Sequence, residues 1–209
     1  MRADEVAEAY NARADLLSEV LGTSVSADDP DRQVIEPWAQ TVRGRILDVG
    51  SGTGRWSGHL TALGHEVDGI EPAAHFVDIA RRNYPAVPFR LASINELESS
   101  DEQWAGVLAW YSLIHMDGDE LPAALATLRR LLDENGSILL SFFTGPRFAE
   151  IGHPATTAYL WPMETMTRAV EQAGFEVTEQ HAKTGSPHAY LIARTSSRGP
   201  AIPQPRVRG

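Results

Sequence analysis

The stretch that decides the fold reads Ile46-Leu-Asp-Val-Gly50-Ser-Gly-Thr-Gly54-Arg-Trp56. Its apolar beginning predicts a buried strand, and the residues from Arg55 onward predict a helix. The glycines between them allow the backbone to turn sharply and to approach a ligand closely, because they carry no Cβ. In doubly wound α/β sheets, ligands bind beyond the carboxyl ends of the strands, where such a turn lies. The stretch predicts a ligand-binding α/β fold, although a purely structural turn can have the same pattern.

Strands and helices alternate from this stretch towards the end of the chain. Short apolar or β-branched runs predict strands at Arg45–Val49, His65–Ile70, Val87–Ala92, Gly106–Trp110 and Ser137–Phe143. Helical spacing of apolar residues predicts helices at Arg55–Leu63, Ala73–Asn83, Asp119–Leu132 and Pro162–Gly174. Strands joined by helices of this length pair in parallel, with helices on both faces of the sheet.

The last two predicted strands are connected in another way. Phe175–Lys183 and His188–Thr195 are separated only by the turn Thr184–Pro187, and a turn this short joins antiparallel strands. The sequence therefore predicts an α/β protein with a Rossmann-like, doubly wound sheet of seven strands. The sheet is expected to be mostly parallel and to end in a C-terminal antiparallel β-hairpin.

The predicted α/β core covers residues 44–195, and the residues before it have helical patterns. These patterns lie at Ala3–Leu21 and Asp31–Thr41. We expect residues 1–43 to form a helical cap over the ligand cleft, so that residues 1–195 make one domain. Residues 196–209 are polar and rich in Pro and Arg, a composition that cannot bury a core. This last part is predicted to be a flexible tail.

Composition and charge exclude several classes of site and partner. The 209 residues contain no cysteine, which excludes disulfides, thiolate nucleophiles and Cys-ligated zinc or iron–sulfur sites. No histidines and acids have metal-ligand spacing such as HExxH, so no metal is predicted. A formal net charge of −10 disfavours a nucleic-acid partner. The chain shows neither a secretory signal nor a membrane-spanning apolar stretch, which predicts a cytoplasmic protein without a membrane partner.

Two details of the glycine pattern distinguish between nucleotide ligands. The dinucleotide fingerprint GxGxxG needs its third glycine where this chain has Arg55, which counts against NAD and FAD. Glu71 ends the second predicted strand about 20 residues after the glycine turn, where an acid accepts hydrogen bonds from ribose hydroxyls. A carboxylate at that place also disfavours the phosphorylated ribose of NADP.

These residues resemble those of a known family. The run Ile46–Gly54 is similar to motif I of the class I S-adenosylmethionine-dependent methyltransferases, and Glu71 matches their ribose-binding acid. The resemblance extends from about Arg45 to Arg194, and within the family it is closest to small bacterial methyltransferases of the UbiE-like type. The segment Ala109–His115 resembles their post-strand-four segment, and Leu131–Ser137 resembles their "LkPGG" turn.

The resemblance implies S-adenosyl-L-methionine as cofactor and S-adenosyl-L-homocysteine as its product. The implied cofactor-binding residues are Asp48, Gly50, Ser51, Gly52, Thr53, Gly54, Arg55, Glu71, Pro72, Ala73, Ser93, Ile94, Trp110 and Tyr111. Asp48, the glycine turn and Arg55 would face the methionine portion, and Glu71 the ribose. Residues 72–73 and 93–94 would flank the adenine, although Ser93 replaces the family's usual Asp. Residues 110–111 would lie beside the sulfonium, unless they are core aromatics.

The acceptor side carries fewer signals. His115 follows the fourth predicted strand and is the candidate general base, although a half-buried imidazole that bonds the backbone would have the same position. His153, Tyr159 and Trp161 lie where the family has its acceptor-binding insert. As exposed residues of a loop over the cleft they are candidate acceptor contacts, although aromatics in such a loop can equally anchor it. Tyr10, from the predicted cap, completes this set.

The sequence therefore predicts in-line methyl transfer to an O-, N- or C-nucleophile of a small molecule. No Asn-Pro-Pro-Tyr-like tetrapeptide follows the fourth strand, and such a motif is what the amino methyltransferases of nucleobases and glutamine carry there. One alternative is a module or sensor that binds S-adenosylmethionine without catalysis. A less favoured alternative is an NAD-dependent oxidoreductase. The oligomeric state and the acceptor are not predicted.

Overall fold

The computed structural model describes residues 3–196, so residues 197–209 of the predicted tail lie outside it. The helices are α1 (Ala3–Asn11), α2 (Ala14–Leu21), α3 (Arg32–Thr41), α4 (Arg55–Ala62), α5 (Ala74–Asn83), α6 (Glu120–Leu131) and α7 (Met163–Gln172), with a short 3-10 helix at Asn95–Leu97. The strands are β1 (Ile46–Val49), β2 (Val67–Glu71), β3 (Phe89–Leu91), β4 (Trp104–Ala109), β5 (Leu132–Thr144), β6 (Ala149–Gly152), β7 (Thr157–Trp161), β8 (Phe175–Ala182) and β9 (His188–Thr195).

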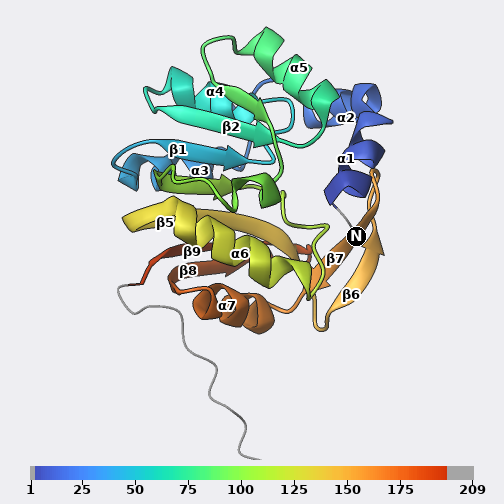
Figure 1. Cartoon of the computed structure of the whole chain (residues 1–209). Helices are drawn as coiled ribbons and strands as arrows, with labels where there is room; N and C mark the ends of the chain where they lie inside the picture. Colours follow the sequence, from blue (N-terminus) through green and yellow to red (C-terminus); the bar gives the residue numbers. More distant parts are fainter. Residues whose placement is uncertain (1–2, 197–209) are drawn as a thin grey trace, which may run out of the picture.

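The strands form one mixed sheet, as predicted. β1 pairs in parallel with β2 and β4, β2 with β3, and β4 with β5. β9 lies antiparallel between β5 and β8, which confirms the C-terminal hairpin. Figure 1 shows α6 and α7 in front of the sheet and α3 and α4 behind it. The predicted doubly wound α/β fold is therefore confirmed.

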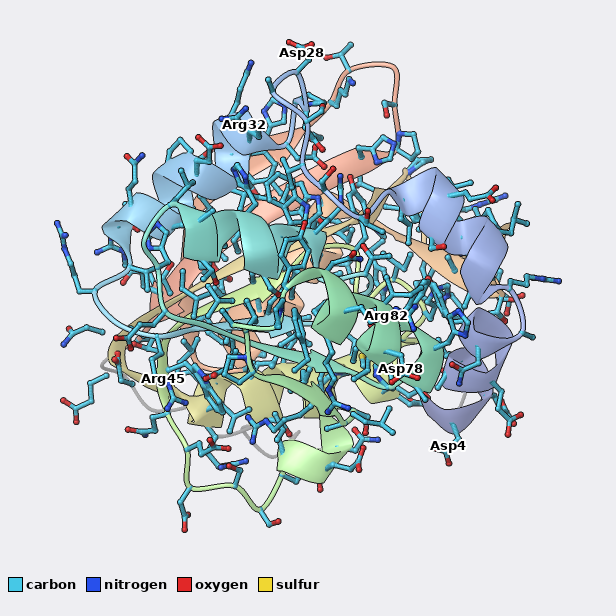
Figure 2. The ribbon with its side chains drawn as sticks, turned by 90° about the horizontal axis from the view of Figure 1, so that it is seen from above. Asp4, Asp28, Arg32, Arg45, Asp78 and Arg82 are labelled. Atoms are coloured by element: carbon cyan, nitrogen blue, oxygen red, sulfur yellow. The ribbon has the colours of Figure 1, made fainter. Side chains whose placement is uncertain are left out.

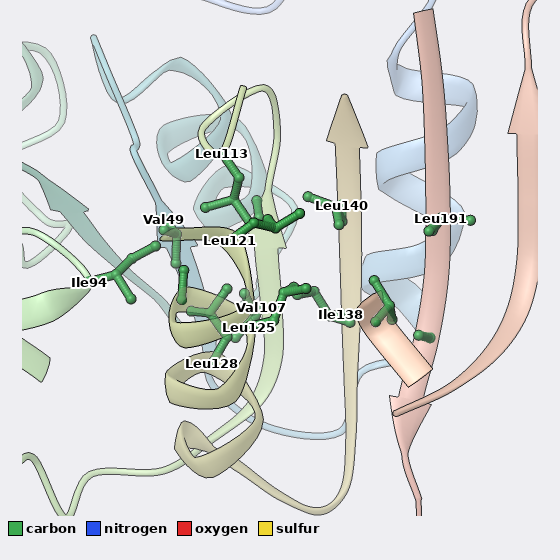
Figure 3. Packing of buried hydrophobic residues seen from close by; sticks show 14 of the residues in the cluster. Val49, Ile94, Val107, Leu113, Leu121, Leu125, Leu128, Ile138, Leu140 and Leu191 are labelled. Atoms are coloured by element: carbon green, nitrogen blue, oxygen red, sulfur yellow. The ribbon is translucent and has the colours of Figure 1, made fainter. Parts of the chain in front are cut away.

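The core on the α6 side explains how the sheet is held. Leu121, Leu125 and Leu128 recur at helical spacing and are fully buried. They pack over β1, β4 and β5, where Figure 3 shows them against Val107 and Ile138. Full burial of each such side chain contributes about 1.5–3 kcal/mol. This packing holds the strands in register, so that their carboxyl ends meet at one edge of the sheet.

The sheet has nine strands, two more than the seven predicted. The extra strands β6 and β7 form an antiparallel hairpin in the segment that was expected to be a loop. β7 pairs in parallel with Phe143 and Thr144, at the end of β5, beyond the point where pairing with β4 ends at Leu140. These strands are no shorter than β1, but the segment was expected to be the family's acceptor-binding loop, so no strand was assigned there. Whether they form depends on the pairing of β7 with the end of β5, which is a tertiary contact.

The predicted cap is two separate structures. α1 and α2 lie at the carboxyl ends of the strands, as Figure 1 shows. α3 packs instead on the face of the sheet, where Ile35, Trp38 and Ala39 are buried against residues of β1, β4 and β5. The Trp38 indole N–H donates a hydrogen bond of 3.0 Å to the hydroxyl of Ser137 in β5. Only α1 and α2 are therefore placed to cover a ligand.

The surface is strongly charged. Figure 2 shows labelled acidic and basic side chains pointing outward around the molecule: Asp4, Asp28, Arg32, Arg45, Asp78 and Arg82. Within residues 3–196, no helix combines the length and the apolar character needed to span a membrane.

Candidate active site

Two adjoining cavities lie at the carboxyl ends of the parallel strands. We call one the apolar slot, which has a volume of about 360 Å³ and is lined by Val49, Ile70, Pro72, Ala92, Ile94 and Met116 among others. We call the other the aromatic chamber, which has a volume of about 330 Å³ and is lined by Tyr10, Phe76, Trp110, Tyr111, Phe143 and His153 among others. The cavities share Val6, Gly50, Pro72, Ser112 and His115 in their walls. They are two compartments of one site.

Each of the three glycines in the turn is favoured over other residues for its own structural reason. All three have positive φ: 65° at Gly50, 55° at Gly52 and 77° at Gly54. A Cβ at Gly50 would lie 2.6 Å from Cβ of Ser112, and one at Gly54 would lie 2.7 Å from Cζ of Phe89. A Cβ at Gly52 would meet no protein atom within 4 Å. Because Gly52 lines the aromatic chamber, its open side leaves space for a ligand.

Glu71 joins the glycine turn to the chamber. Its Oε2 accepts a 2.9 Å hydrogen bond from the amide of Gly52, and its Oε1 accepts one of 2.8 Å from the amide of Ala73. Burial raises the pKa of Glu71 to about 7, against the lowering effect of the two amides. Each carboxylate oxygen keeps a further lone pair on the chamber side, so the group can still accept hydrogen bonds from a ligand.

Asp48 has a structural setting. It is 3% exposed, and Oδ2 accepts a 2.6 Å hydrogen bond from the hydroxyl of Ser57 in α4. Burial raises its pKa to about 6. Asp48 is not among the residues that line either cavity. Its observed contact therefore ties β1 to α4, and its predicted contact with the methionine portion remains a proposal.

The rest of the turn holds the segment between α2 and α3. The hydroxyl of Thr53 donates to the carbonyl of Gly22 at 2.7 Å, and the guanidinium of Arg55 lies 2.8 Å from the carboxylate of Asp29. Arg55 is not among the residues that line either cavity, and Asp29 pairs with its Nη1, so its predicted contact with the methionine carboxylate remains a proposal. Ser51 is buried, and its hydroxyl has no hydrogen-bond partner among the described residues.

The apolar slot contains the residues predicted to flank an adenine. Pro72, Ser93 and Ile94 line it together with Ile70, as the strand order requires. Both the amide and the hydroxyl of Ser93 donate to Oε2 of Glu96, at 2.7 and 3.0 Å, so the serine belongs to a local turn. Ala73 is fully buried and lines neither cavity, and its contribution is the amide that binds Glu71.

The segment after β4 brings two predicted aromatics and one missed hydroxyl to the chamber. The indole N–H of Trp110 donates to Asp31 at 2.9 Å, and the backbone amide of Tyr111 donates to Ser141 at 2.7 Å. Tyr111 has a φ of 55°, a strained left-handed conformation for an aromatic residue, and such strain is found often at functional sites. The Ser112 hydroxyl is buried between both cavities without a partner in the described part of the chain.

His115 and Tyr10 form a buried pair across 105 positions of sequence. Nδ1 of His115 lies 2.6 Å from the carbonyl oxygen of Thr157, which can only accept, so this nitrogen carries the proton. Burial lowers the pKa of His115 and keeps the ring neutral, which leaves Nε2 as an acceptor. The Tyr10 hydroxyl therefore donates to Nε2 at 2.9 Å. The contact with the backbone agrees with the structural interpretation of His115. Because the ring also lines the chamber, its role as general base stays a prediction.

The acceptor residues predicted in the insert divide into two groups. His153 lines the chamber, with its ring centroid 5.0 Å from that of His115. Tyr159 and Trp161 lie in β7, where they are 8% and 6% exposed, and they line neither cavity. Their rings pack on Phe148 at centroid distances of 5.2 and 4.7 Å. The interpretation of these two residues as exposed acceptor contacts is therefore wrong, and the alternative that they anchor the segment agrees with their burial, because β7 turns these rings into the core.

Several chamber residues were missed. Phe76 in α5, Phe143 at the end of β5 and His188 at the start of β9 all line the chamber. Phe143 and His188 are direct partners in the β5–β9 ladder, and Nδ1 of His188 lies 2.6 Å from the Tyr111 hydroxyl. The predicted C-terminal hairpin was the signal that could have identified His188. This residue begins the second strand of the hairpin, which runs antiparallel to β5 and therefore starts at the carboxyl edge of the sheet.

Metal chemistry finds no support in the side-chain arrangement. Among the residues whose placement is described, no three His, Asp or Glu side chains are grouped so as to hold a metal ion.

Comparisons with known proteins agree with the geometry. Residues 46–136 match the family model described as a methyltransferase domain. A malonyl-[acyl-carrier protein] O-methyltransferase of Serratia marcescens is 32% identical over 108 residues, which cover 52% of this chain and 42% of that protein. A demethylmenaquinone methyltransferase of Renibacterium salmoninarum is 25% identical over 195 residues, which cover 93% of this chain and 74% of the other. The chain thus spans less than half the length of the first of these relatives.

A solved structure shows the same fold. The magnesium protoporphyrin IX methyltransferase of Synechocystis PCC 6803, with S-adenosylmethionine bound, superposes with a TM-score of 0.72. Its sequence is 18% identical, and the superposition covers 94% of this chain and 99% of that one. Together with the family match, this confirms the resemblance that the glycine turn and Glu71 indicated.

Proposed function

We propose that this chain, whose residues 46–136 belong to the methyltransferase domain family, transfers a methyl group from S-adenosylmethionine to a small-molecule acceptor. The observation that carries the proposal is the setting of Glu71. This carboxylate is buried at the end of β2, is held by the amides of Gly52 and Ala73, and lines the aromatic chamber together with Gly52, whose open side faces no protein atom within 4 Å. An acid at this place accepts hydrogen bonds from ribose hydroxyls.

The residues present fit the cofactor. Glu71 would hold the ribose, the apolar slot between Pro72 and Ile94 would take the adenine, and the open side of Gly52 would admit the methionine portion. The unpartnered hydroxyl of Ser112, between the two cavities, offers a further hydrogen bond. When bound, the cofactor supplies an activated methyl group on a cationic sulfonium. The faces of Trp110 and Tyr111 line the chamber and attract a cation by cation–π interaction.

The chain's own contribution to catalysis is positioning and proton acceptance. Alignment of the reacting groups in a closed cavity lowers the barrier by up to about 7–11 kcal/mol. We assign His115 as the base because its ring is neutral and its proton is on Nδ1. Nε2 is therefore unprotonated and accepts the hydrogen bond of the Tyr10 hydroxyl. A positioned general base contributes about 10²–10⁴-fold in rate. The acidic net charge of −10 supports a small acceptor over a nucleic acid.

The test is isothermal titration with S-adenosylhomocysteine, beside NADH and beside a Glu71→Ala variant. We expect the thioether to bind and the affinity of the variant to fall by about tenfold or more, because a hydrogen bond to a charged group contributes about 1.5–3 kcal/mol. The matched control is Glu66→Ala, which removes an exposed acid just before β2. No heat with the thioether, or tighter binding of NADH, would overturn the proposal. Binding without turnover on any acceptor would instead favour a sensor.

A further inference from the structure

Aromatic side chains form a continuous wall around the chamber. Their ring centroids follow one another at distances between 5.0 and 6.5 Å, in the order Tyr10, His115, His153, Phe143, Tyr111 and Trp110. These rings come from α1, the segment after β4, the β6–β7 hairpin and the end of β5. Aromatic pairs in tilted or edge-to-face geometry contribute about 0.5–1.5 kcal/mol beyond the area they bury. A flat aromatic ligand finds matching partners on several sides.

The wall offers no cation to an anionic ligand. None of the described residues that line the chamber is Lys or Arg, and Glu71 is its one acid. The nearby guanidinium of Arg13 donates to the carbonyls of Pro154 and Ala155. Burial lowers the pKa of His153 to about 4, with a further lowering from the adjacent His115. A carboxylate or phosphate on the acceptor would therefore be buried without a partner, which is unfavourable.

The polar groups of the wall are arranged to take up a proton. Tyr10 donates its hydroxyl proton to Nε2 of His115, so the phenol oxygen keeps lone pairs that can accept from an acceptor hydroxyl. Nδ1 of His115 is anchored on the carbonyl of Thr157 in β7, which fixes the ring and its tautomer. A path for one proton thus leads from the chamber through Tyr10 to His115.

We propose that the acceptor is an uncharged aromatic compound with a ring hydroxyl, bound against this wall and deprotonated through Tyr10 and His115. This proposal rests on the proposed function. The acceptor hydroxyl gives its proton to the phenol oxygen of Tyr10, while Tyr10 gives its own proton to Nε2 of His115. The acceptor oxygen bonds to the methyl carbon as the carbon–sulfur bond breaks, and the sulfur keeps that electron pair. His115 ends as an imidazolium, so charge and atoms balance.

The experiment is isothermal titration of the full chain, saturated with S-adenosylhomocysteine, with three probes. 1-Naphthol has the proposed ring and hydroxyl, 1-naphthoate carries an anion on the same ring, and decahydro-1-naphthol keeps the hydroxyl without aromaticity. We expect 1-naphthol to bind at least about tenfold more tightly than either of the others. Tyr10→Phe keeps the ring contacts and should weaken 1-naphthol about fivefold, the factor for one net hydrogen bond. The control Tyr190→Phe removes a hydroxyl that bonds Glu179, away from the cavities.

Each outcome decides the proposal. Preference for 1-naphthol with loss in Tyr10→Phe and no loss in Tyr190→Phe supports it. Equal or tighter binding of 1-naphthoate or decahydro-1-naphthol overturns it, as does a Tyr10→Phe variant that binds 1-naphthol unchanged. No binding of 1-naphthol by a protein that binds S-adenosylhomocysteine overturns this inference alone. No binding of S-adenosylhomocysteine overturns the proposed function and, with it, this inference.

Discussion

The two compartments of the site are built in different ways. The apolar slot and the glycine turn use mainly the ends of β1, β2 and β3 and the residues that follow them, with further lining from α1, the segment after β4 and the start of α6. The aromatic chamber is assembled from α1, α2, α5, the residues after β4, and the β6–β7 hairpin. Its central contact joins Tyr10 to His115 across 105 positions. The residues of the apolar slot are placed mainly by the sheet itself, whereas those of the aromatic chamber are placed by the packing of separate elements.

The largest expected effect tests whether Trp161 of the β6–β7 hairpin belongs to the hydrophobic core and not to the ligand site. Trp161→Ala should lower the free energy of unfolding by about 3–5 kcal/mol, because it removes a buried indole. Binding of S-adenosylhomocysteine per folded molecule should not change. Urea denaturation measures the first quantity and titration the second. The control Phe148→Ala, at a ring that is 44% exposed, should cost only about 1 kcal/mol. A smaller loss for Trp161→Ala than for this control would contradict the assignment.

The second test separates packing from ligand space within the glycine turn. Gly54→Ala should lower the free energy of unfolding by about 2–4 kcal/mol, since its Cβ meets Phe89 and its φ is 77°. Gly52→Ala should lose only about 1–2 kcal/mol for its positive φ, but its Cβ enters the chamber and should weaken S-adenosylhomocysteine. Gly118→Ala, in open space, serves as the control. Equal stability of the variants at 52 and 54 would show that packing does not distinguish them.

The third test uses the pH dependence of stability. The folded-state pKa of Asp48 is about 6, above its ordinary value of 3.8, so the folded protein binds this proton more tightly than the unfolded chain. Stability from this group is present below 3.8 and is lost as the pH rises through about 6, by at most about 3 kcal/mol. Asp48→Asn lacks this loss. The difference in unfolding free energy, variant minus unaltered protein, should rise between these pH values and then stay level.

That difference is measured by urea denaturation over a pH series. Glu71 has a raised pKa too and loses stability in the same direction in both proteins. The Asp48 charge contributes to raising that pKa, so Asp48→Asn also reduces this loss and adds to the expected rise of the difference. A difference that does not change with pH would mean that the Asp48 carboxyl is not raised in the folded state.

The smallest expected effect tests whether Arg55 only pairs with Asp29 or also contacts the ligand. Arg55→Gln breaks the partly buried pair with Asp29 and should lower the free energy of unfolding by about 1 kcal/mol. S-adenosylhomocysteine affinity should change by less than about threefold. Arg32→Gln, which breaks the i,i+4 pair with Glu36, is the matched control. A tenfold loss of affinity in Arg55→Gln alone would show that Arg55 contacts the ligand, and it would weaken the distinction between the two compartments.

The alternating pattern of strands and helices was sufficient to predict the α/β fold and the edge of the sheet at which the glycine turn and Glu71 lie. Glu71 and the glycine turn could be placed because a parallel strand that precedes a helix must end at one edge of the sheet. The same reasoning did not anticipate the pair between Arg55 and Asp29, since nothing local indicated that Asp29 would reach this residue. It failed for Tyr159 and Trp161, whose burial depends on the pairing of β7 with the end of β5.

The sequence by itself determined the α/β class, the succession of the central strands and helices along the chain, and the residues at the carboxyl ends of the strands, because periodicity and turn chemistry are local properties of the chain. Tertiary structure alone decided which rings face the chamber, how the Thr157 carbonyl fixes the tautomer of His115 that accepts from Tyr10, and why α3 packs on the sheet while α1 and α2 lie at the cavities. These outcomes depend on packing between residues far apart in the chain, and no local pattern encodes such contacts.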